Sequence, residues 1–183
     1  MLLDASKSTL LIIDVQPRLF EKIFEFKIIE RYILNCTKIF TKLKIPVVYS
    51  EQYPQGLGET VDVFLKDLEL CNAKRLVKTT FSCFPHRSDS INVKNYIKTK
   101  QVILLGIETH ICVLQTALDL KNQGFNVYVI YEAVGSRKIK DKELGIERLK
   151  MSEITILSFE MMLFELLRDS NNEHFKELSK IIK

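Results

Sequence analysis

The sequence predicts an α/β fold of three layers, in which a six-stranded and mostly parallel sheet lies between helices. Short apolar runs rich in β-branched residues alternate along the chain with longer segments whose apolar residues recur at helical spacing. Such an alternation forms βαβ units, and their right-handed crossovers place helices on both faces of the sheet. The length of 183 residues suits one domain, so we expect a single domain over residues 1–183.

The first strand is expected at residues 9–15, a continuously apolar run of the kind found in parallel strands that are covered on both faces. Five more runs are expected to be strands, and the third strand in chain order has the weakest pattern. The five runs span residues 46–50, 73–78, 101–106, 126–131 and 155–157.

Helices are expected between these strands, and Gly124 is placed to end the one that precedes the fifth strand. Pro17 is expected to end regular structure after the first strand. Residues 51–58 contain Pro54 and two glycines and are expected to form a loop. The expected helices span residues 26–43, 88–98, 109–122 and 142–150, and two more follow the sixth strand.

Composition and charge exclude several classes of protein. The net charge of +4 is scattered among acidic residues, which argues against a nucleic-acid surface. No apolar run approaches the roughly 18 residues that a membrane-spanning helix needs. The start of the chain has no basic, apolar or amphipathic leader, and the four cysteines form no CxxC pair. We therefore expect a soluble cytoplasmic protein with reduced thiols, and a mitochondrial location stays open.

Chemically active residues follow three of the expected strands. Asp14 comes after the first strand, Lys78 ends the third, and residues 106–112 follow the fourth and contain Cys112. In parallel α/β sheets, ligands bind beyond the carboxyl ends of the strands. Each residue alone has a plainer explanation, as a packed thiol, a turn residue or a solvated lysine. Their coincidence at one edge of the sheet is what predicts a site.

Cys112 is the expected nucleophile of this site. If Thr109 caps the helix that follows, Cys112 lies in its first turn, where free N–H groups and the helix dipole stabilise a thiolate. A nearby Lys78 would lower the pKa of the thiol further, and Asp14 could accept its proton and then serve as acid and base.

These same residues resemble a known family. Residues 11–16, 78–82 and 106–113 read LIIDVQ, KTTFS and GIETHICV, and together they resemble the isochorismatase-like hydrolases. The loop of residues 51–58 and the later segment 118–120 resemble the eukaryotic isochorismatase domain-containing proteins. Some relatives of those proteins carry a mitochondrial-associated ribonuclease label.

The resemblance implies a Rossmann-like sheet of six parallel strands and a catalytic triad of Asp14, Lys78 and Cys112. It also implies a cis peptide bond between Ile107 and Glu108. This bond would aim the N–H of Glu108 beside that of Cys112 to form an oxyanion hole. Members of the family commonly assemble, so the resemblance implies a dimer or a tetramer.

Two departures from the family narrow the expected reaction. Nicotinamidases bind a metal through an Asp-x-His motif after the second strand, but residues 50–54 contain no histidine, so we expect no metal. In addition, isochorismatases lack the cysteine that this chain keeps as Cys112. Independently of the family, residues 56–58 lack the glycine pattern of a phosphate loop, so we expect no nucleotide cofactor. The expected function is therefore cofactor-independent hydrolysis of a small amide, ester or related molecule.

Several residues near the expected site are candidates for binding the substrate, because aromatic and polar side chains line most small-molecule pockets. The aromatic ones could equally belong to the core, and the histidine could be a capping or lining group. Cys83 could be a redox-sensitive thiol or a packed one, and His86 is read as a loop residue. The candidates for substrate binding are Gln16, Phe20, Gln52, Tyr53, Phe81 and His110.

Two functions from other classes compete with hydrolysis. The chain could be a non-catalytic interaction or scaffold protein that retains the site. It could also be a ribonuclease, although the scattered charge argues against RNA binding.

Overall fold

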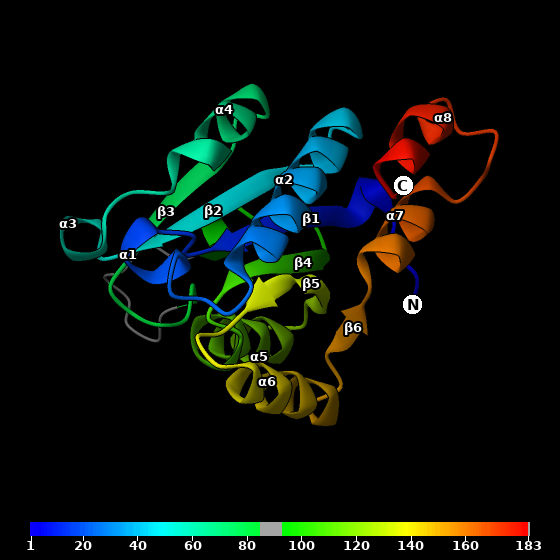
Figure 1. Ribbon diagram of the computed structural model, residues 1–183. Coiled ribbons are helices and arrows are strands. Elements are labelled where there is room, and N and C mark those ends of the chain that lie inside the picture. The colour runs from blue at the N-terminus through cyan, green and yellow to red at the C-terminus, as the bar shows by residue number, and fades with distance from the viewer. Residues whose placement is uncertain (85–92, 183) are drawn as a thin grey trace.

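One sheet of six parallel strands forms the centre of the molecule, which confirms the expected α/β fold (Figure 1). The computed structural model describes residues 1–84 and 93–182. Its strands lie in the order β3-β2-β1-β4-β5-β6. They are β1 (Ser8–Ile13), β2 (Val47–Gln52), β3 (Lys74–Lys78), β4 (Gln101–Ile107), β5 (Asn126–Gly135) and β6 (Thr155–Leu157).

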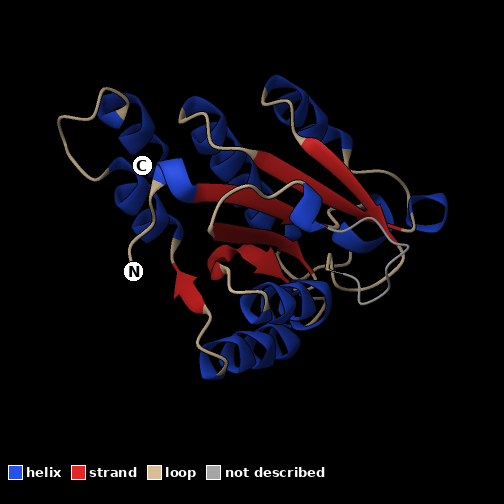
Figure 2. Cartoon of the chain, turned by 180° about the vertical axis from the view of Figure 1, so that it is seen from behind, coloured by secondary structure: helices blue, strands red, loops and turns tan. Residues whose placement is uncertain are grey.

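Eight α-helices lie among the residues that the structure describes, and the larger ones form two layers. The helices α2, α4 and α7 cover one face of the sheet, and α5 and α6 cover the other (Figures 1 and 2). The bounds are α1 (Pro17–Phe20), α2 (Phe26–Lys42), α3 (Pro54–Leu57), α4 (Asp62–Leu70), α5 (Leu114–Asn122), α6 (Ile139–Met151), α7 (Phe159–Leu167) and α8 (Phe175–Leu178).

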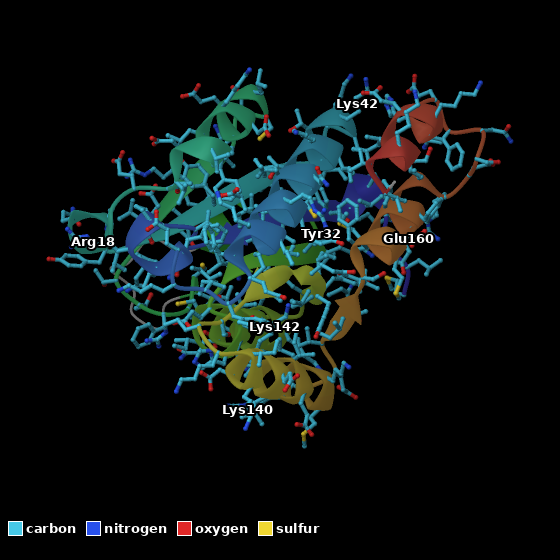
Figure 3. The ribbon with its side chains drawn as sticks, viewed as in Figure 1. Arg18, Tyr32, Lys42, Lys140, Lys142 and Glu160 are labelled. Carbon is cyan, nitrogen blue, oxygen red and sulfur yellow. The ribbon has the colours of Figure 1, made fainter. Side chains whose placement is uncertain are left out.

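The central strands supply both layers of the core. Every residue of β1 and β4 is buried, as expected for parallel strands that helices cover on both sides. Along β1 the side chains alternate between the faces, so that Leu10 and Ile12 pack with α2 while Leu11 and Ile13 pack with α5. The outer sides of the helices carry exposed charges, such as Lys140 on α6 and Glu160 on α7 (Figure 3).

Two expectations about the segments after β1 and β2 are wrong, and one helix there was not expected. Pro17 opens α1 instead of ending regular structure, because the fixed φ and missing N–H of proline suit the first position of a helix. Pro54 opens α3 in the same way inside the expected loop of residues 51–58. The helix α4 was not expected, although Phe64 and Leu68 lie four residues apart and both are buried.

The expected helix over residues 109–122 is two elements. Residues Thr109–Val113 form a π-helical turn, and α5 begins only at Leu114. Thr109 does not cap the helix. The N-cap position belongs to Glu108, and the buried hydroxyl of Thr109 has no hydrogen-bond partner among the described residues. Gly124 follows the end of α5 with a φ of 80°, which confirms its expected role as the stop.

Part of the expected helix over residues 88–98 lies outside the described residues. His86 also lies outside them. The described part of residues 88–98 contains only the 3-10 turn Val93–Asn95, so the expected α-helix is wrong there. Within residues 1–84 and 93–182, no helix is long and apolar enough to cross a membrane.

A close approach between β1 and β4 predicts an intolerant glycine. Gly106 has a φ of 107°, and a Cβ built there would overlap the backbone of Ile13. We expect Gly106→Ala to lower the free energy of unfolding by more than about 3 kcal/mol in urea titrations, because strain and overlap add. Gly124→Ala is the matched control. Its φ is also positive, but nothing lies within 4 Å of the added atom, so we expect a loss of about 1 kcal/mol. Equal losses would contradict this explanation.

Candidate active site

The carboxyl edge of the sheet brings together the three residues that the sequence singled out. Asp14 follows β1, Lys78 ends β3, and Cys112 lies in the π-helical turn after β4. The Nζ atom of Lys78 lies 2.6 Å from Oδ2 of Asp14, and both side chains are almost fully buried. Cys112 is 7% exposed, and the carboxylate of Asp14 is near enough to raise the pKa of its thiol. Asp14 is therefore the residue that links the other two.

Asp14 is held by its backbone and by both of its carboxylate oxygens. Its φ of 51° lies in the left-handed region, which short polar side chains such as aspartate tolerate. Its N–H donates to the carbonyl of Ser50 at 3.2 Å. The hydroxyl of Ser50 donates to Oδ1 at 2.7 Å, while Oδ2 accepts from Lys78. This bonding fixes the direction of the carboxylate.

Lys78 is surrounded by oxygen atoms. Besides Asp14, its ammonium donates to Oε1 of Gln52 at 2.8 Å and to the carbonyls of Thr80 and Phe81 at 3.2 and 3.1 Å. Burial acts to lower the pKa of Lys78, but the charge of Asp14 and the neighbouring thiols raise it above its usual value. The ammonium is therefore charged at neutral pH.

Cys112 does not have the lowered pKa that the sequence analysis expected. Burial raises the pKa of its thiol well above the usual range, and the carboxylate of Asp14 raises it further, while Lys78 acts in the opposite direction. Lys78 acts in the expected direction, but desolvation and the carboxylate of Asp14 outweigh it. At rest the site contains a neutral thiol that faces a carboxylate able to take its proton.

The segment between β4 and Cys112 has the backbone feature that the resemblance implied. The peptide bond between Ile107 and Glu108 is cis. The carbonyl of Glu108 accepts from the N–H groups of Ile111 and Val113 at 3.0 and 3.2 Å, which closes the π-helical turn around Cys112. The oxyanion hole formed by the N–H groups of Glu108 and Cys112 stays a prediction.

The two glutamines expected to bind substrate have different surroundings. The amide of Gln16 donates to the carbonyls of Gln52 and Gly58 at 3.0 and 2.6 Å, and its Oε1 accepts from the N–H of Gln52 at 2.7 Å. Gln16 is fully buried. Its hydrogen bonds tie the loop after β2 to the segment that follows β1. Gln52 bonds Lys78 through Oε1 and the carbonyl of Thr79 through Nε2, and it keeps some exposed surface beside the ion pair.

The expected aromatic contacts separate into one core residue and two rim residues. Phe20 is 1% exposed and packs edge-on against Phe26 and Phe64 on the α2 side of the sheet, so its expected place at the site is wrong. Phe20 does not reach the site because α1 turns its side chain into the core. Tyr53 directly follows β2, Phe81 lies in the loop after β3, and they are 54% and 56% exposed. Both lie at the carboxyl edge and are available to a ligand.

His110 is bonded to a residue that the sequence analysis missed. Its Nδ1 lies 2.9 Å from the hydroxyl of Ser136, which follows β5. Arg137, the next residue, donates to the carboxylate of Glu108. Ser50 was also missed, although a serine inside an apolar strand was a visible signal. Ser136 and Arg137 could be found only from the pairing of β4 with β5.

The second thiol near the site is packed. Cys83 has no exposed surface, and its N–H donates to the hydroxyl of Thr116 at 3.0 Å. Burial raises the pKa of Cys83 to about 11, although Lys78 acts to lower it. Cys36 is likewise fully buried in the core. Among the residues that the structure describes, no group of three or more His, Cys, Asp and Glu could hold a metal ion.

Residues 8–160 match the family model described as the Isochorismatase domain. The chain belongs to the isochorismatase family. It is 34% identical to isochorismatase domain-containing protein 2 of Bos taurus, in an alignment that covers 96% of this chain and 83% of that protein.

Two solved structures share the fold over almost the whole chain. The structure of the MAR1 ribonuclease from Caenorhabditis elegans has a TM-score of 0.87 and 33% identity, and the match covers 100% of this chain and 92% of that one. The YcaC gene product from Escherichia coli, described as an octameric hydrolase of unknown specificity, has a TM-score of 0.83 and 20% identity. That match covers 99% of this chain and 89% of that one.

The buried ion pair predicts a coupled loss of stability. We expect Lys78→Met to lower the free energy of unfolding by about 3–5 kcal/mol in urea titrations, because it leaves the Asp14 carboxylate buried without its cation. Adding Asp14→Asn should recover part of this loss. Lys7→Met is the control, and it should change little because the pair of Lys7 with Asp4 is exposed. Additive losses from the two site substitutions would contradict the coupling.

The buried thiols predict that stability falls in alkali. The pKa values of Cys36, Cys83 and Cys112 are raised from 9.0 in the folded chain, so above pH 9 the unfolded chain loses thiol protons that the folded chain keeps. The free energy of unfolding should fall by about 1.4 kcal/mol per pH unit for each such thiol. Urea titrations from pH 8 to 10.5 under reducing conditions measure this. Cys36→Ala should make the slope shallower, and a flat profile in the parent chain would overturn the prediction.

Proposed function

We propose that this isochorismatase-family chain is a cofactor-independent hydrolase of a small amide, ester or related substrate, with Cys112 as its nucleophile. The observation that carries the proposal is the buried pair of Lys78 and Asp14, whose charges both act on the pKa of the Cys112 thiol at the same edge of the sheet. Burying two charges is costly, and a contact with a nucleophile gives the pair a chemical purpose.

The proposed reaction starts from the neutral thiol. The sulfur of Cys112 attacks the carbonyl carbon while its proton passes to Asp14, and Lys78 keeps its charge beside the carboxylate. The N–H groups of Glu108 and Cys112 stabilise the oxygen that becomes negative. The C–N or C–O bond then breaks, the leaving amine or alcohol takes the proton from Asp14, and a thioester remains.

Water completes the proposed cycle. Asp14 takes a proton from a water molecule, whose oxygen attacks the thioester. The acid product leaves, and the thiol of Cys112 regains its proton. We assign Gln52, Tyr53, Phe81 and His110 to the substrate side, because Gln52 borders the ion pair and the two aromatic residues are exposed at the same edge.

We also propose that copies of this chain associate with one another in the cytoplasm. The support is the octameric assembly stated for the Escherichia coli protein of the same fold.

A second candidate function is RNA cleavage, which the name of the similar Caenorhabditis elegans structure favours. Against it stands the distribution of charge, because lysines and arginines alternate with acidic residues along the chain. A scaffold role would need neither the ion pair nor a reactive thiol.

The proposed hydrolysis predicts the effect of two substitutions. In a screen of small amides and activated esters, we expect Cys112→Ser and Asp14→Asn each to lower turnover by at least about 100-fold, because one removes the nucleophile and the other its base. Cys71→Ser, at a half-buried thiol outside the site, is the control. Mass spectrometry should detect the acyl group on Cys112.

The same variants separate the competing functions. Hydrolysis that is unchanged in Cys112→Ser would overturn the proposal. RNA cleavage lost in both Cys112→Ser and Asp14→Asn would favour the ribonuclease, whereas cleavage that persists in both would come from a contaminant.

A further inference from the structure

The segment after β5 bonds to the turn that carries Cys112 at two points. The backbone N–H and the Nε–H of Arg137 both donate to Oε2 of Glu108, each at 3.1 Å. The hydroxyl of Ser136 lies 2.9 Å from Nδ1 of His110. The Glu108 side chain is only 8% exposed, so its carboxylate depends on Arg137 for a counter-charge.

The pairing of β4 with β5 places these residues side by side. Leu104 pairs with Val129 but Gly106 pairs with Val134, so β5 advances by five residues where β4 advances by two. Beyond this irregularity Ile107 pairs with Gly135, and the residues that follow the two strands meet at the carboxyl edge. A bulge of this kind redirects the residues next to a site.

The helix α6 supports the same turn from another side. A Cβ added at Gly145 would lie 3.0 Å from Cα and 3.1 Å from N of His110, and 3.2 Å from the carbonyl carbon of Thr109. A side chain at position 145 would therefore require the backbone of the turn to shift by a few tenths of an ångström. The position of residues 108–112 is therefore fixed by two sets of contacts. One is the hydrogen bonds from residues 136–137, and the other is the backbone packing of α6.

We propose that Arg137 is a positioning residue for acyl transfer, which acts through the carboxylate of Glu108 to orient the backbone N–H of that residue toward the developing oxyanion. This inference rests on the proposed function, because it requires attack by Cys112 on a carbonyl carbon. It goes beyond that function by assigning a role to a residue that contacts neither the thiol nor the buried ion pair.

Two reactions of the same thiol separate this role from a general structural one. In alkylation by iodoacetamide, the sulfur attacks a saturated carbon, iodide leaves, and no oxyanion forms. In acylation by p-nitrophenyl acetate, the sulfur attacks a carbonyl carbon, an oxyanion forms, and p-nitrophenolate leaves. Both reactions pass the thiol proton to Asp14, but only acylation uses an oxyanion hole.

The experiment measures both rates at Cys112 in the full chain, alkylation by mass spectrometry and acylation by the release of p-nitrophenolate. Loss of a complete oxyanion donor costs about 100-fold or more, so we expect the partial misplacement in Arg137→Gln to slow acylation about tenfold. Alkylation should keep its rate. Arg137→Lys, which retains a cation, should recover part of the acylation rate.

The matched control is Arg75, which makes the same kind of ion pair elsewhere. It bonds Oε2 of Glu51 at 2.9 and 2.6 Å, and that side chain is 2% exposed. Arg75→Gln should leave the ratio of acylation to alkylation unchanged. If Arg137→Gln does not fold, Arg137→Lys and Glu108→Gln measure the same ratio, and each should lower it.

Three outcomes would overturn the inference: equal slowing of both reactions in the Arg137 variants, no change in either reaction, or the same change in ratio from Arg75→Gln. Failure of the proposed function gives a different result. Acylation that continues in Cys112→Ser would show that the thiol is not the nucleophile, whatever the Arg137 variants do.

Discussion

A lysine and an aspartate share a charge-assisted hydrogen bond of 2.6 Å with almost no access to water, and the arrangement of the carboxyl edge depends on them. An isolated charge in this position would be expensive, so each partner requires the other and a shell of further oxygens and hydrogen-bond donors. Ser50 and Gln52 supply that shell from β2, which lies between the strands that carry the pair. The loop after β3 is in turn held by Gln52 and by the carbonyls that bond Lys78.

The same pair determines the state of the Cys112 thiol. The position at a helix start and the attraction of Lys78 were the basis for expecting an ionised cysteine. Lys78 does act to lower the pKa of the thiol, but burial and the carboxylate of Asp14, which is bonded to Lys78, raise that pKa by more. A buried cysteine beside a carboxylate keeps its proton until an electrophile arrives. This state of the thiol suits the base-assisted attack that we propose better than an attack by a preformed thiolate.

Sequence patterns could predict those parts of the molecule that depend on local chemistry. The central strands appear as continuous apolar runs, and Asp14, directly after β1, and Lys78, at the end of β3, mark one edge of the sheet. What local patterns could not supply is the contact between distant segments. The pairing of Ser50 with Ile13, the irregular register before Gly135, and the bonds from Arg137 and Ser136 all depend on how strands align across the sheet. Phe20 was misplaced for the same reason, because nearness to Asp14 in the chain does not reveal which face of the sheet a side chain packs on.

The close contact of β1 with β4 connects the core to the chemistry. Gly106 pairs with Ile13, one residue before Asp14, and it starts the segment that leads through the turn of residues 108–112 to Cys112. A side chain at Gly106 would push these strands apart and move the carboxylate away from the thiol. The register irregularity between β4 and β5 acts on the other side of β4, where it brings Arg137 to Glu108. The turn that carries Cys112 is thus located from two neighbouring strands, β1 through backbone contact and β5 through side-chain bonds. A rigid frame of this kind is what an oxyanion site needs, because its N–H groups must point at the reacting oxygen before the charge forms.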